Sequence, residues 1–333
     1  MPPLTRIVVS AAALVVAVSP ALAAEKPEGA VRIATWNIEN WTDNFQAYRD
    51  RDQPQPATEE GREARAQVGY ANDEDNWEVA QTILSPDFHP DVLVFQEGCS
   101  QEELDYFAGE WLGDDYPTRI VFPTNSDRGQ TIGLMAREGF EILETKDQYH
   151  LLPDEKNLNP RSDYLFARGP AFVKMKSPGG DEFWVGVTHQ KSKSGNSVET
   201  TIWRSAEAAA SNQIIRDLAA EGPEAVFLLG DMNDELGYQE FEIEAGGDTI
   251  SKLVGDGDND PSNDLVLVTR PLAEGGAISY TGYWRDRYRS FIDQIVATEA
   301  GAEKVVDVVL YETPWALVAS DHLPVYADVQ FGE

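Results

Sequence analysis

The chain has 333 residues, with 58 acidic side chains against 26 basic ones, and its formal net charge is −32. So negative a chain excludes nonspecific binding of nucleic acid or of an anionic membrane by its whole surface, but it is compatible with a local basic patch. Cys99 is the only cysteine, which excludes an intrachain disulfide and a thiolate metal cluster.

The first 23 residues have the pattern of a secretory signal. Arg6 is the early charge, the apolar run at 7–18 is too short to span a bilayer, and small residues end the segment at 21–23. An uncleaved membrane anchor is the alternative, but the short apolar run favours cleavage. We therefore expect a secreted or periplasmic protein without a membrane span, in which a short linker at 24–30 precedes one catalytic domain at 31–333.

Two apolar runs in the first third are predicted to be buried strands. The sequence VRIATWNI alternates as a strand does and stops at Asn37, and PDVLVFQE ends at Glu97. Between them, residues 41–75 are polar and interrupted by proline, which is typical of a long surface insertion, with a helix beginning near Thr58. Residues 76–84 look helical.

A helix followed by a series of short strands is predicted next. SQEELDYFAGEWL places Glu103 three residues after Ser100, the spacing of a capping box, and its apolar residues have a helical period. The runs TRIVF, TIGLMA, FEILE, YLFARGPAFVKMK and DEFWVGVTHQ then alternate with turn residues. We expect a largely antiparallel sheet there.

The rest of the chain combines one clear helix with further strands. WRSAEAAASNQIIRDLAAEG is rich in alanine and ends on glycine, and it leads into the strand VFLLGDMND. The strand-like runs DLVLVT, AISYTGYW, SFIDQIVAT, VVDVVLYE and VYADVQF follow. Two sheets with helices outside them fit this order, which predicts an α/β (α+β) sandwich.

Polar residues stand where these apolar runs stop or, in one case, within such a run. Oxygen ligands dominate the set, with two imidazoles beside them, so convergence of these segments would form a divalent-cation site with general acid–base groups at hand. Singly, each residue has a plainer interpretation as a turn residue, a solvated side chain or a structural histidine, and only the ensemble favours chemistry. The residues are Asn37, Glu97, His189, Asp231, Asn233, Asp293, Asp321 and His322.

The ordered motifs TWNI, FQE, THQ, GDMND, IDQI and SDHLPV resemble those of the endonuclease/exonuclease/phosphatase superfamily, the DNase I-like metal-dependent phosphoesterases. The resemblance covers about residues 31–329. It implies a four-layer sandwich of two central, mostly antiparallel sheets flanked by helices, with the active site at one edge. Within the superfamily, the stretch THQKSKSG and the following helix with Arg204 are most similar to secreted bacterial nucleases.

The resemblance also implies roles for the candidate residues. His322 is similar to the general base or phosphate-polarising imidazole, Asp293 to its carboxylate partner, and His189 to the histidine that assists the leaving oxygen. Asp231 and Asn233 would orient the attacking water and hold the phosphate or a second ion. The implied ion is Mg²⁺, with Mn²⁺ or Ca²⁺ as alternatives, and its implied ligands are Asn37, Glu97, Asp231, Asn233 and Asp321.

Several basic residues near these motifs are candidates for phosphate binding. Arg168 falls where DNase I-like nucleases place a phosphate-binding arginine, and two lysines follow the THQ motif, although a lysine-rich turn is the plain alternative. The stretch at 280–294 interleaves aromatic residues with arginines, which can stack a base and bind phosphate, or can pair with nearby acids. The candidates are Arg168, Lys191, Lys193, Arg285 and Arg287.

Some features depart from the family pattern and leave the substrate open. Met232 and Gln294 replace residues that are commoner in the family, and the insertion at 41–75 directly follows a metal-site motif. The acidic run at 255–264 could be a calcium-stabilised loop, but it lacks the spacing of an EF-hand, and a solvated turn is the plainer interpretation.

We therefore predict a secreted, metal-dependent phosphodiesterase that uses direct attack of water on extracellular nucleic acid, as a monomer with no stable protein partner. The basic residues favour a nuclease, whereas the net charge argues against one. A phosphatase or phospholipid phosphodiesterase of the same superfamily is the alternative, and a non-catalytic binding protein is a third. Endonuclease and exonuclease action both stay open.

Overall fold

The computed structural model describes residues 25–41, 73–126, 129–194, 198–223, 225–237, 242, 244, 247–256, 260–280 and 289–332. The predicted signal, the helix expected near Thr58 and most of the insertion lie outside the described residues. Arg285 and Arg287 also lie outside them, as do residues 257–259 of the acidic run. In the described ranges, no helix is both long enough and apolar enough to cross a bilayer.

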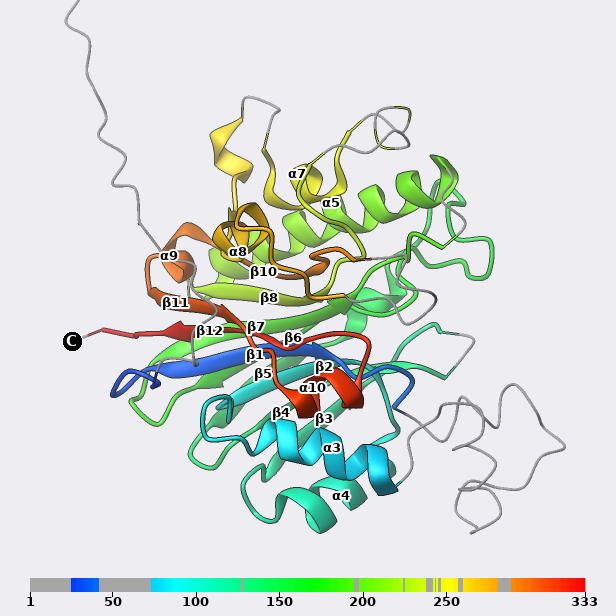
Figure 1. Ribbon diagram of the computed structural model, residues 1–333. Helices are drawn as coiled ribbons and strands as arrows, with labels where there is room; N and C mark the ends of the chain where they lie inside the picture. The colour runs from blue at the N-terminus through cyan, green and yellow to red at the C-terminus, as the bar shows by residue number, and fades with distance from the viewer. Residues whose placement is uncertain are drawn as a thin grey trace, which may run out of the picture.

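The first sheet has six strands in the described part of the chain, in the order β11-β12-β1-β2-β4-β3 (Figure 1). The pair β1–β2 is parallel, and the other neighbours are antiparallel. Asn37 pairs with Gln96, so the run that ends in Asn37 and the run that ends in Glu97 finish at the same edge. The strands are β1 (Val31–Asn37), β2 (Val92–Gly98), β3 (Thr118–Phe122), β4 (Thr131–Ala136), β11 (Val305–Leu310) and β12 (Val325–Val329).

The second sheet, also six-stranded in the described ranges, has the order β5-β6-β7-β8-β10-β9. Here β7–β8 is the parallel pair, and it places His189 opposite Asp231. β10 runs antiparallel to β8 and places Asp293 opposite Asp231 from the other side. The strands are β5 (Glu141–Lys146), β6 (Ala171–Lys176), β7 (Glu182–His189), β8 (Val226–Asp231), β9 (Val266–Leu267) and β10 (Asp293–Ala297).

The central strands β1, β2, β7 and β8 are buried on both faces because each sheet packs against the other sheet on one side and against helices on the other, whereas the outer strands β3, β5 and β11 are largely half-buried or exposed. Alternate residues such as Ile33 and Val94 of the first sheet face Val185 and Leu229 of the second in one shared core. The other faces pack under helices, which Figure 1 shows as separate outer layers. The helices are α3 (Asp73–Ile83), α4 (Gln101–Phe107) and α10 (Pro314–Ala319) over the first sheet, and α5 (Val198–Glu221) and α7 (Thr249–Val254) over the second.

The four-layer sandwich predicted from the sequence is confirmed, and so is the capping box. Ser100 accepts a hydrogen bond from the backbone N–H of Glu103, whose side chain accepts one from the backbone N–H of Ser100. α4 then continues as one π-helical stretch, while the short element α8 lies beside β11 and the short element α9 beside β8 and β10. Their bounds are Ala108–Leu112 for the π-helix, Arg270–Glu274 for α8, Glu299–Ala302 for α9, and Gln148–Leu151 and Pro261–Asn263 for two 3₁₀ turns.

The structure places a helix before Asp321. The apolar run ALVA, which precedes Asp321 and His322, is not a strand, because residues Pro314–Ala319 form α10. Thr313 caps this helix by accepting a hydrogen bond from the backbone N–H of Ala316, and Pro314 occupies a first-turn position, where its missing N–H costs nothing.

Two predicted strands are shorter than expected, and a third, predicted over residues 277–284, lies only partly within the described ranges. The run at 164–176 becomes a strand only at Ala171, because Gly169 has a φ of +83° and Pro170 has no N–H to pair. The run at 264–269 forms only the two-residue strand β9. Tyr280 forms single bridges with Ser290 and His322, and the residues that follow it lie outside the described ranges.

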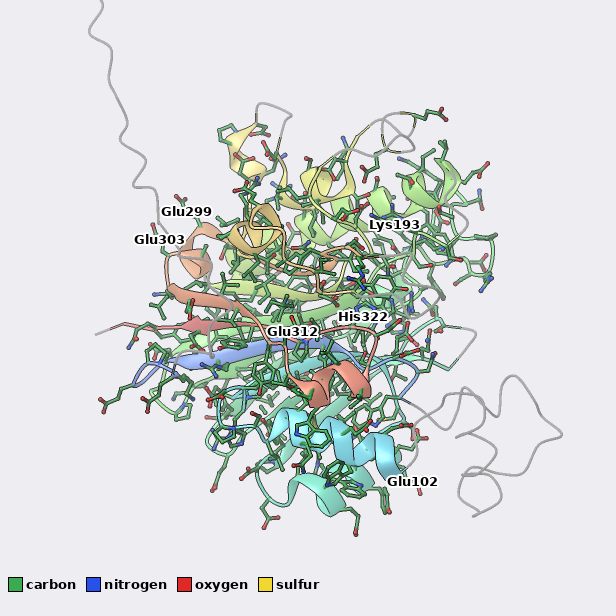
Figure 2. All side chains as sticks on the ribbon, viewed as in Figure 1. Glu102, Lys193, Glu299, Glu303, Glu312 and His322 are labelled. Carbon is green, nitrogen blue, oxygen red and sulfur yellow. The ribbon has the colours of Figure 1, made fainter. Side chains whose placement is uncertain are left out.

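Acidic side chains are distributed over the helices and loops. Figure 2 labels Glu102 at the start of α4, Glu299 and Glu303 around α9, and Glu312 before α10, and all four are exposed. His322, by contrast, is buried at the edge where strands of both sheets end. The negative charge of these four residues lies on the solvated surface, where it favours solubility.

Candidate active site

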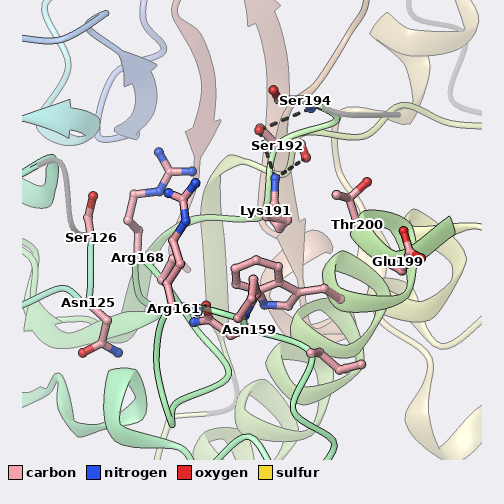
Figure 3. Close-up of a pocket in the computed structure, with 14 residues that line it drawn as sticks. Asn125, Ser126, Asn159, Arg161, Arg168, Lys191, Ser192, Ser194, Glu199 and Thr200 are labelled. Atoms are coloured by element: carbon pink, nitrogen blue, oxygen red, sulfur yellow. Dashed lines mark hydrogen bonds between the residues drawn. The ribbon is translucent and has the colours of Figure 1, made fainter. Parts of the chain in front are cut away.

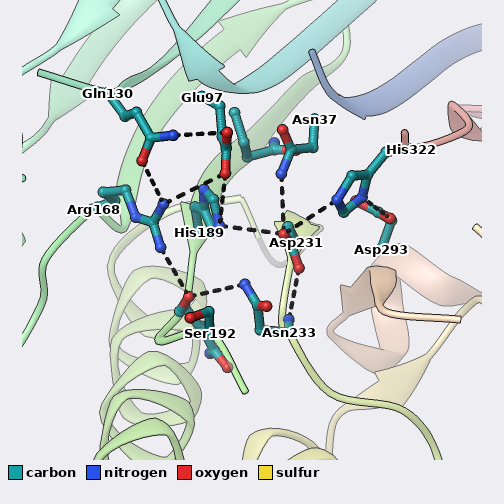
Figure 4. Close-up of polar contacts among 12 residues, drawn as sticks. Asn37, Glu97, Gln130, Arg168, His189, Ser192, Asp231, Asn233, Asp293 and His322 are labelled. Atoms are coloured by element: carbon teal, nitrogen blue, oxygen red, sulfur yellow. Dashed lines mark hydrogen bonds and ion pairs between the residues drawn. The ribbon is translucent and has the colours of Figure 1, made fainter. Parts of the chain in front are cut away.

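The strand ends of both sheets meet around the side chain of Asp231 (Figure 4). Asn37 Nδ2 donates a hydrogen bond to Asp231 Oδ2 over 3.1 Å, and His189 Nε2 lies 3.2 Å from the same oxygen. His322 Nε2 lies 3.9 Å from it. Asp231 is 2 % exposed, so these contacts form in a site from which water is largely excluded. One carboxylate oxygen therefore joins groups from three separate parts of the chain.

The second oxygen of Asp231 fixes the turn that follows β8. Asp231 Oδ1 accepts a hydrogen bond of 2.7 Å from the backbone N–H of Asn233, which has a φ of 51°. An Asx turn of this kind is a local way to hold both residues in place. Asn233 Nδ2 also donates to the backbone carbonyl of Gln190 at 3.1 Å, so the loops after β7 and β8 are tied together.

His322 and Asp293 form a buried pair. His322 Nδ1 lies 2.7 Å from Asp293 Oδ2, and both side chains are at most 5 % exposed. Burial alone would lower the pKa of His322, but the carboxylates of Asp293, Asp321 and Asp231 outweigh it and raise that pKa well above its ordinary value. Nδ1 is directed to Asp293, so Nε2 is the nitrogen that faces Asp231.

Three neighbours fix the position of His322. Its backbone N–H donates to Ser320 Oγ at 3.0 Å, and that hydroxyl donates to the backbone carbonyl of Asn37 at 2.7 Å. Trp36 Nε1 donates to the carbonyl of His322 at 2.9 Å. The ring of Tyr280 lies over the imidazole with 4.7 Å between centroids. The loop after α10 is thereby held against β1, although no strand carries His322.

Glu97 is held on the opposite side of Asp231 by a residue that the sequence analysis missed. Gln130 Nε2 donates to Glu97 Oε2 at 2.7 Å, and Gln130 Oε1 accepts from Arg168 Nη1 at 3.1 Å. Glu97 Oε1 lies 3.9 Å from Arg168 Nη1 and 4.0 Å from His189 Nε2. The fully buried amide of Gln130 therefore sets the distance between the carboxylate and the guanidinium.

Glu39 is a second residue that the sequence analysis missed. Its Oε2 accepts a hydrogen bond of 3.3 Å from the backbone N–H of Asp321. Burial and the nearby carboxylates of Asp321 and Glu97 raise its pKa to about 7. The available signal was its position two residues after Asn37, in the motif TWNIEN. Acidic groups crowded in this way are typical of a cation site.

The basic candidates separate into different environments. Arg168 is 5 % exposed and belongs to the centre described above. Lys193 Nζ pairs with Asp234 Oδ1 at 3.0 Å and Glu235 Oε1 at 3.4 Å. Lys191 Nζ instead contacts the carbonyl oxygen of Ser192 at 2.9 Å.

A buried charge cluster supports the loop that carries Lys191. Glu207 of α5 accepts a hydrogen bond of 2.6 Å from the backbone N–H of Lys191 through Oε2. Arg204 Nε pairs with Asp234 Oδ2 at 2.8 Å, and Arg204 Nη1 donates to the carbonyl of Lys191 at 3.3 Å. Burial raises the pKa of Glu207 to about 7. The only sequence signal for Glu207 was one acid within an alanine-rich helix, which is a weak one.

The residues present fit a divalent cation. Asp231, Asp293 and His322 each offer a ligand atom, and these atoms lie within 4.8 Å of one another. Asn37 Oδ1 is buried and accepts no hydrogen bond from the described residues, so it is an oxygen that still lacks a polar partner. Carboxylate and amide oxygens with imidazole nitrogen suit a divalent metal.

The comparison with known protein families agrees with this geometry. The sequence profile of the Endonuclease/Exonuclease/phosphatase family matches residues 34–322, so the chain belongs to that family. It is therefore a metal-dependent phosphoesterase, as the resemblance of its motifs predicts. A search of the curated proteins found no match to this sequence.

Solved structures share the fold at low sequence identity. The catalytic domain of human Nocturnin with bound sulfate has 17% identity and a TM-score of 0.57, over 90% of this chain and 93% of that one. Truncated TDP2 from Caenorhabditis elegans has 13% identity and a TM-score of 0.55, over 90% and 97%. A mannosyl-6-phosphatase from Bacteroides thetaiotaomicron has 18% identity and a TM-score of 0.53, over 90% and 100%.

Proposed function

We propose that this chain is a secreted, Mg²⁺-dependent phosphodiesterase that hydrolyses extracellular nucleic acid by direct attack of water. The observation that carries the proposal is the arrangement of Asp293, His322 and Asp231, in which a buried carboxylate orients an imidazole toward a second buried carboxylate. Mn²⁺ and Ca²⁺ are alternative ions with the same preference for oxygen ligands.

The oxygen-rich side of the site would hold the cation. Glu97 and Asp321 face the region of Glu39, where like charges already crowd, and Asn37 Oδ1 accepts no hydrogen bond from the part of the chain that the structure describes. A divalent ion bound there would neutralise charge on the nonbridging oxygens of the phosphate. The ligands that we propose are those expected from the family resemblance, namely Asn37, Glu97, Asp231, Asn233 and Asp321. Asp293 and His322 lie close enough to Asp231 to share an ion with it, but they bind each other and are assigned to proton transfer instead.

The two histidines would manage protons on the two sides of the phosphorus. Figure 4 shows His189 and His322 on either side of Asp231. His322 is oriented through Nδ1 by Asp293, so its Nε2 can hold or transfer a proton where water attacks. His189 Nε2 would then serve the leaving oxygen. Arg168, fixed by Gln130, would balance the negative charge of the phosphate.

Hydrolysis of phosphomonoesters is the second candidate function. The mannosyl-6-phosphatase of similar fold acts, by its name, on a sugar phosphate, and this chain has a cavity of small-molecule size beside Arg168. The strongly negative charge of the chain also suits a small substrate better than a long polyanion.

One set of assays tests both functions. Purified protein is incubated with Mg²⁺ and plasmid DNA, RNA, bis-p-nitrophenyl phosphate or p-nitrophenyl phosphate, each with and without a chelator. Chelator-sensitive cleavage of nucleic acid and of the diester is the expected result. Cleavage of the monoester alone would establish the phosphatase instead, and no turnover of any substrate would favour a binding protein.

Export is a separate part of the proposal. The pattern of the first 23 residues supports a cleaved signal, so the mature chain should begin at Ala24. N-terminal sequencing of protein recovered from the medium or periplasm checks this. A protein retained in the cytoplasm with its first residues intact would overturn it.

A further inference from the structure

A cavity of about 430 Å³ lies beside the candidate active site (Figure 3). This volume is in the range of small-molecule sites. Arg168 is shared, because it contacts Gln130 and approaches Glu97 in the centre and also lines the cavity. The polar and aromatic residues of its wall that matter here are Asn125, Asn159, Arg161, Arg168, Lys191 and Trp203.

The charge of this cavity is opposite to that of the molecule. Among the described residues, its lining holds three cationic side chains, Arg161, Arg168 and Lys191, and one carboxylate, the exposed Glu199. The whole chain, in contrast, has 58 acidic and 26 basic residues. A local excess of positive charge in so acidic a chain favours an anionic ligand.

The ammonium group of Lys191 is held in place without a carboxylate partner. Its Nζ donates to the carbonyl and the hydroxyl of Ser192, at 2.9 and 3.3 Å, and lies 5.7 Å from the ring of Trp203. In the part of the chain that the structure describes, no carboxylate lies within ion-pair distance of this nitrogen. Burial lowers the pKa of Lys191 to about 8, and the positive charges of Arg168 and Arg204 act in the same direction, against the opposing effect of Glu207. A bound anion would relieve this repulsion.

We propose that this cavity binds a phosphomonoester group of the substrate that is distinct from the phosphate being hydrolysed. The inference rests on the proposed function of the neighbouring site. Arg168 lines the cavity and also lies 3.9 Å from Glu97 in the centre, so a group bound in the cavity lies next to the phosphate being hydrolysed. The substrate class is therefore a compound with a second phosphate close to the first, either the phosphorylated end of an oligonucleotide or a sugar bisphosphate.

Two pairs of probes test this inference and distinguish the two sources. Dithymidylate with a 5′-phosphate is compared with dithymidylate without one, and glucose 1,6-bisphosphate with glucose 1-phosphate. Binding is measured by calorimetry and turnover by kcat/KM. In at least one pair, the member with the additional phosphate should have an affinity and a kcat/KM about 10-fold higher or more, because the additional phosphate gains a charge-assisted contact.

Arg161→Gln is the main variant, because Arg161 is exposed and its replacement should leave the fold intact. It should reduce the preference for the second phosphate at least about 3-fold, on the scale of one exposed charged contact. Lys191→Gln should act in the same direction. Arg216→Gln is the matched control, since Arg216 contacts Asn212 and Gln213 of α5 and does not line the cavity. It should keep the full preference.

The outcomes separate the subsite from the proposed function. A preference confined to the nucleotide pair identifies a chain end, and one confined to the glucose pair identifies a sugar bisphosphate. The subsite is refuted if bis-p-nitrophenyl phosphate is hydrolysed but neither pair shows a preference, or if both variants keep it. If no substrate is turned over, the proposed function fails, and the calorimetric comparison still decides whether a phosphate binds here.

Discussion

At the scale of single residues, Asp231 is the point on which the candidate chemistry depends. One of its oxygens is fixed by the N–H of Asn233, and the other faces Asn37, His189 and His322. This division makes the side chain part of both the local turn and the reacting site. Substitution of Asp231 should therefore reduce turnover far more than substitution of a typical buried residue outside the site.

The first prediction concerns Asp231→Ala and His322→Ala. Each should reduce turnover of bis-p-nitrophenyl phosphate by at least roughly 10²-fold, the effect of losing a general acid–base group, while the circular dichroism spectrum stays that of the folded protein. His89→Ala is the matched control, since His89 pairs with Asp115 outside the site. Near-normal rates in either site variant would show that the assigned roles are wrong.

The second prediction concerns the buried carboxyl of Glu207. Its pKa is about 7 in the folded protein, against an ordinary 4.5, so the folded state binds more protons than the unfolded state between these two values. The resulting stability is complete below pH 4.5 and is lost as the pH rises through 7. The loss is on the order of 3 kcal/mol.

Glu207→Gln should remove this dependence, because an amide stays neutral and can still accept the hydrogen bond from Lys191. Urea denaturation at pH 5 and pH 8 measures the free energy of unfolding of both proteins. The variant should gain stability relative to the wild type at the higher pH. The exposed Glu303→Gln should show no such gain. Parallel pH profiles for Glu207→Gln and the wild type would contradict the assignment.

At the scale of elements, alternation and buried runs were sufficient to predict β1, β2, β7 and β8. Their apolar residues are continuous because a sheet lies on one side and helices on the other. The site residues at the ends of these strands could then be predicted too, because the carboxyl ends of the two parallel pairs lie at one edge. Periodicity could not distinguish the short run of α10 from a strand, although Thr313 and Pro314 were available signals.

The missed site residues share a physical reason. Gln130 lies before β4 and Glu39 lies in a turn, and neither ends an apolar run that would draw attention to it. Their roles depend on contacts across the fold, such as that of Gln130 with Arg168 and that of Glu39 with Asp321. Long-range contacts of this kind have no local sequence period. The two lysines after β7 were predicted to bind phosphate from the sequence alone. Only the structure shows that Lys193 forms an ion pair with Asp234, whereas Lys191 contacts the carbonyl of Ser192.

The third prediction concerns the strand that delivers Asp231. Gly230 has a φ of +152°, and a Cβ placed there would lie 2.0 Å from the backbone oxygen of Thr188 in β7. Backbone cannot yield as a flexible side chain does, so Gly230→Ala should separate β7 from β8 and displace Asp231. We expect a loss of about 3 kcal/mol in the free energy of unfolding, at the upper end for overpacking, and loss of activity.

Gly109→Ala is the control for this substitution. Gly109 lies in the π-helical stretch after α4, and a Cβ there would meet nothing within 4 Å. Alanine should be neutral or stabilising by up to about 1 kcal/mol at such a position. Urea midpoints of the two variants measure the difference. Equal midpoints would mean that the close approach of β7 and β8 is not what requires glycine.

At the scale of the whole molecule, the two sheets have the same plan. Each has one parallel pair at its centre and antiparallel neighbours on both sides. Their shared edge gathers Glu39, Glu97, Asp231 and Asp321 in a chain whose surface is already strongly negative. These carboxylates repel one another in the folded state, and a bound cation would reduce that repulsion.

Mg²⁺ should therefore stabilise the folded protein beyond the general effect of salt. An ion that binds only the folded state adds about 2.7 kcal/mol at 100 times its Kd, which raises the Tm by roughly 4 °C in a chain of this size. NaCl at the same ionic strength is the control, since it screens the surface charge without filling the site.

Thermal denaturation followed by circular dichroism, with and without chelator, measures the difference. Asn37→Ala should lose the part of the shift that is specific to Mg²⁺ and keep the part that NaCl reproduces, because Asn37 Oδ1 is a buried oxygen of the site with no hydrogen-bond partner among the described residues. Equal shifts of the Tm in MgCl₂ and NaCl for the wild type would mean that salt only screens these carboxylates and that they bind no Mg²⁺ between the two sheets.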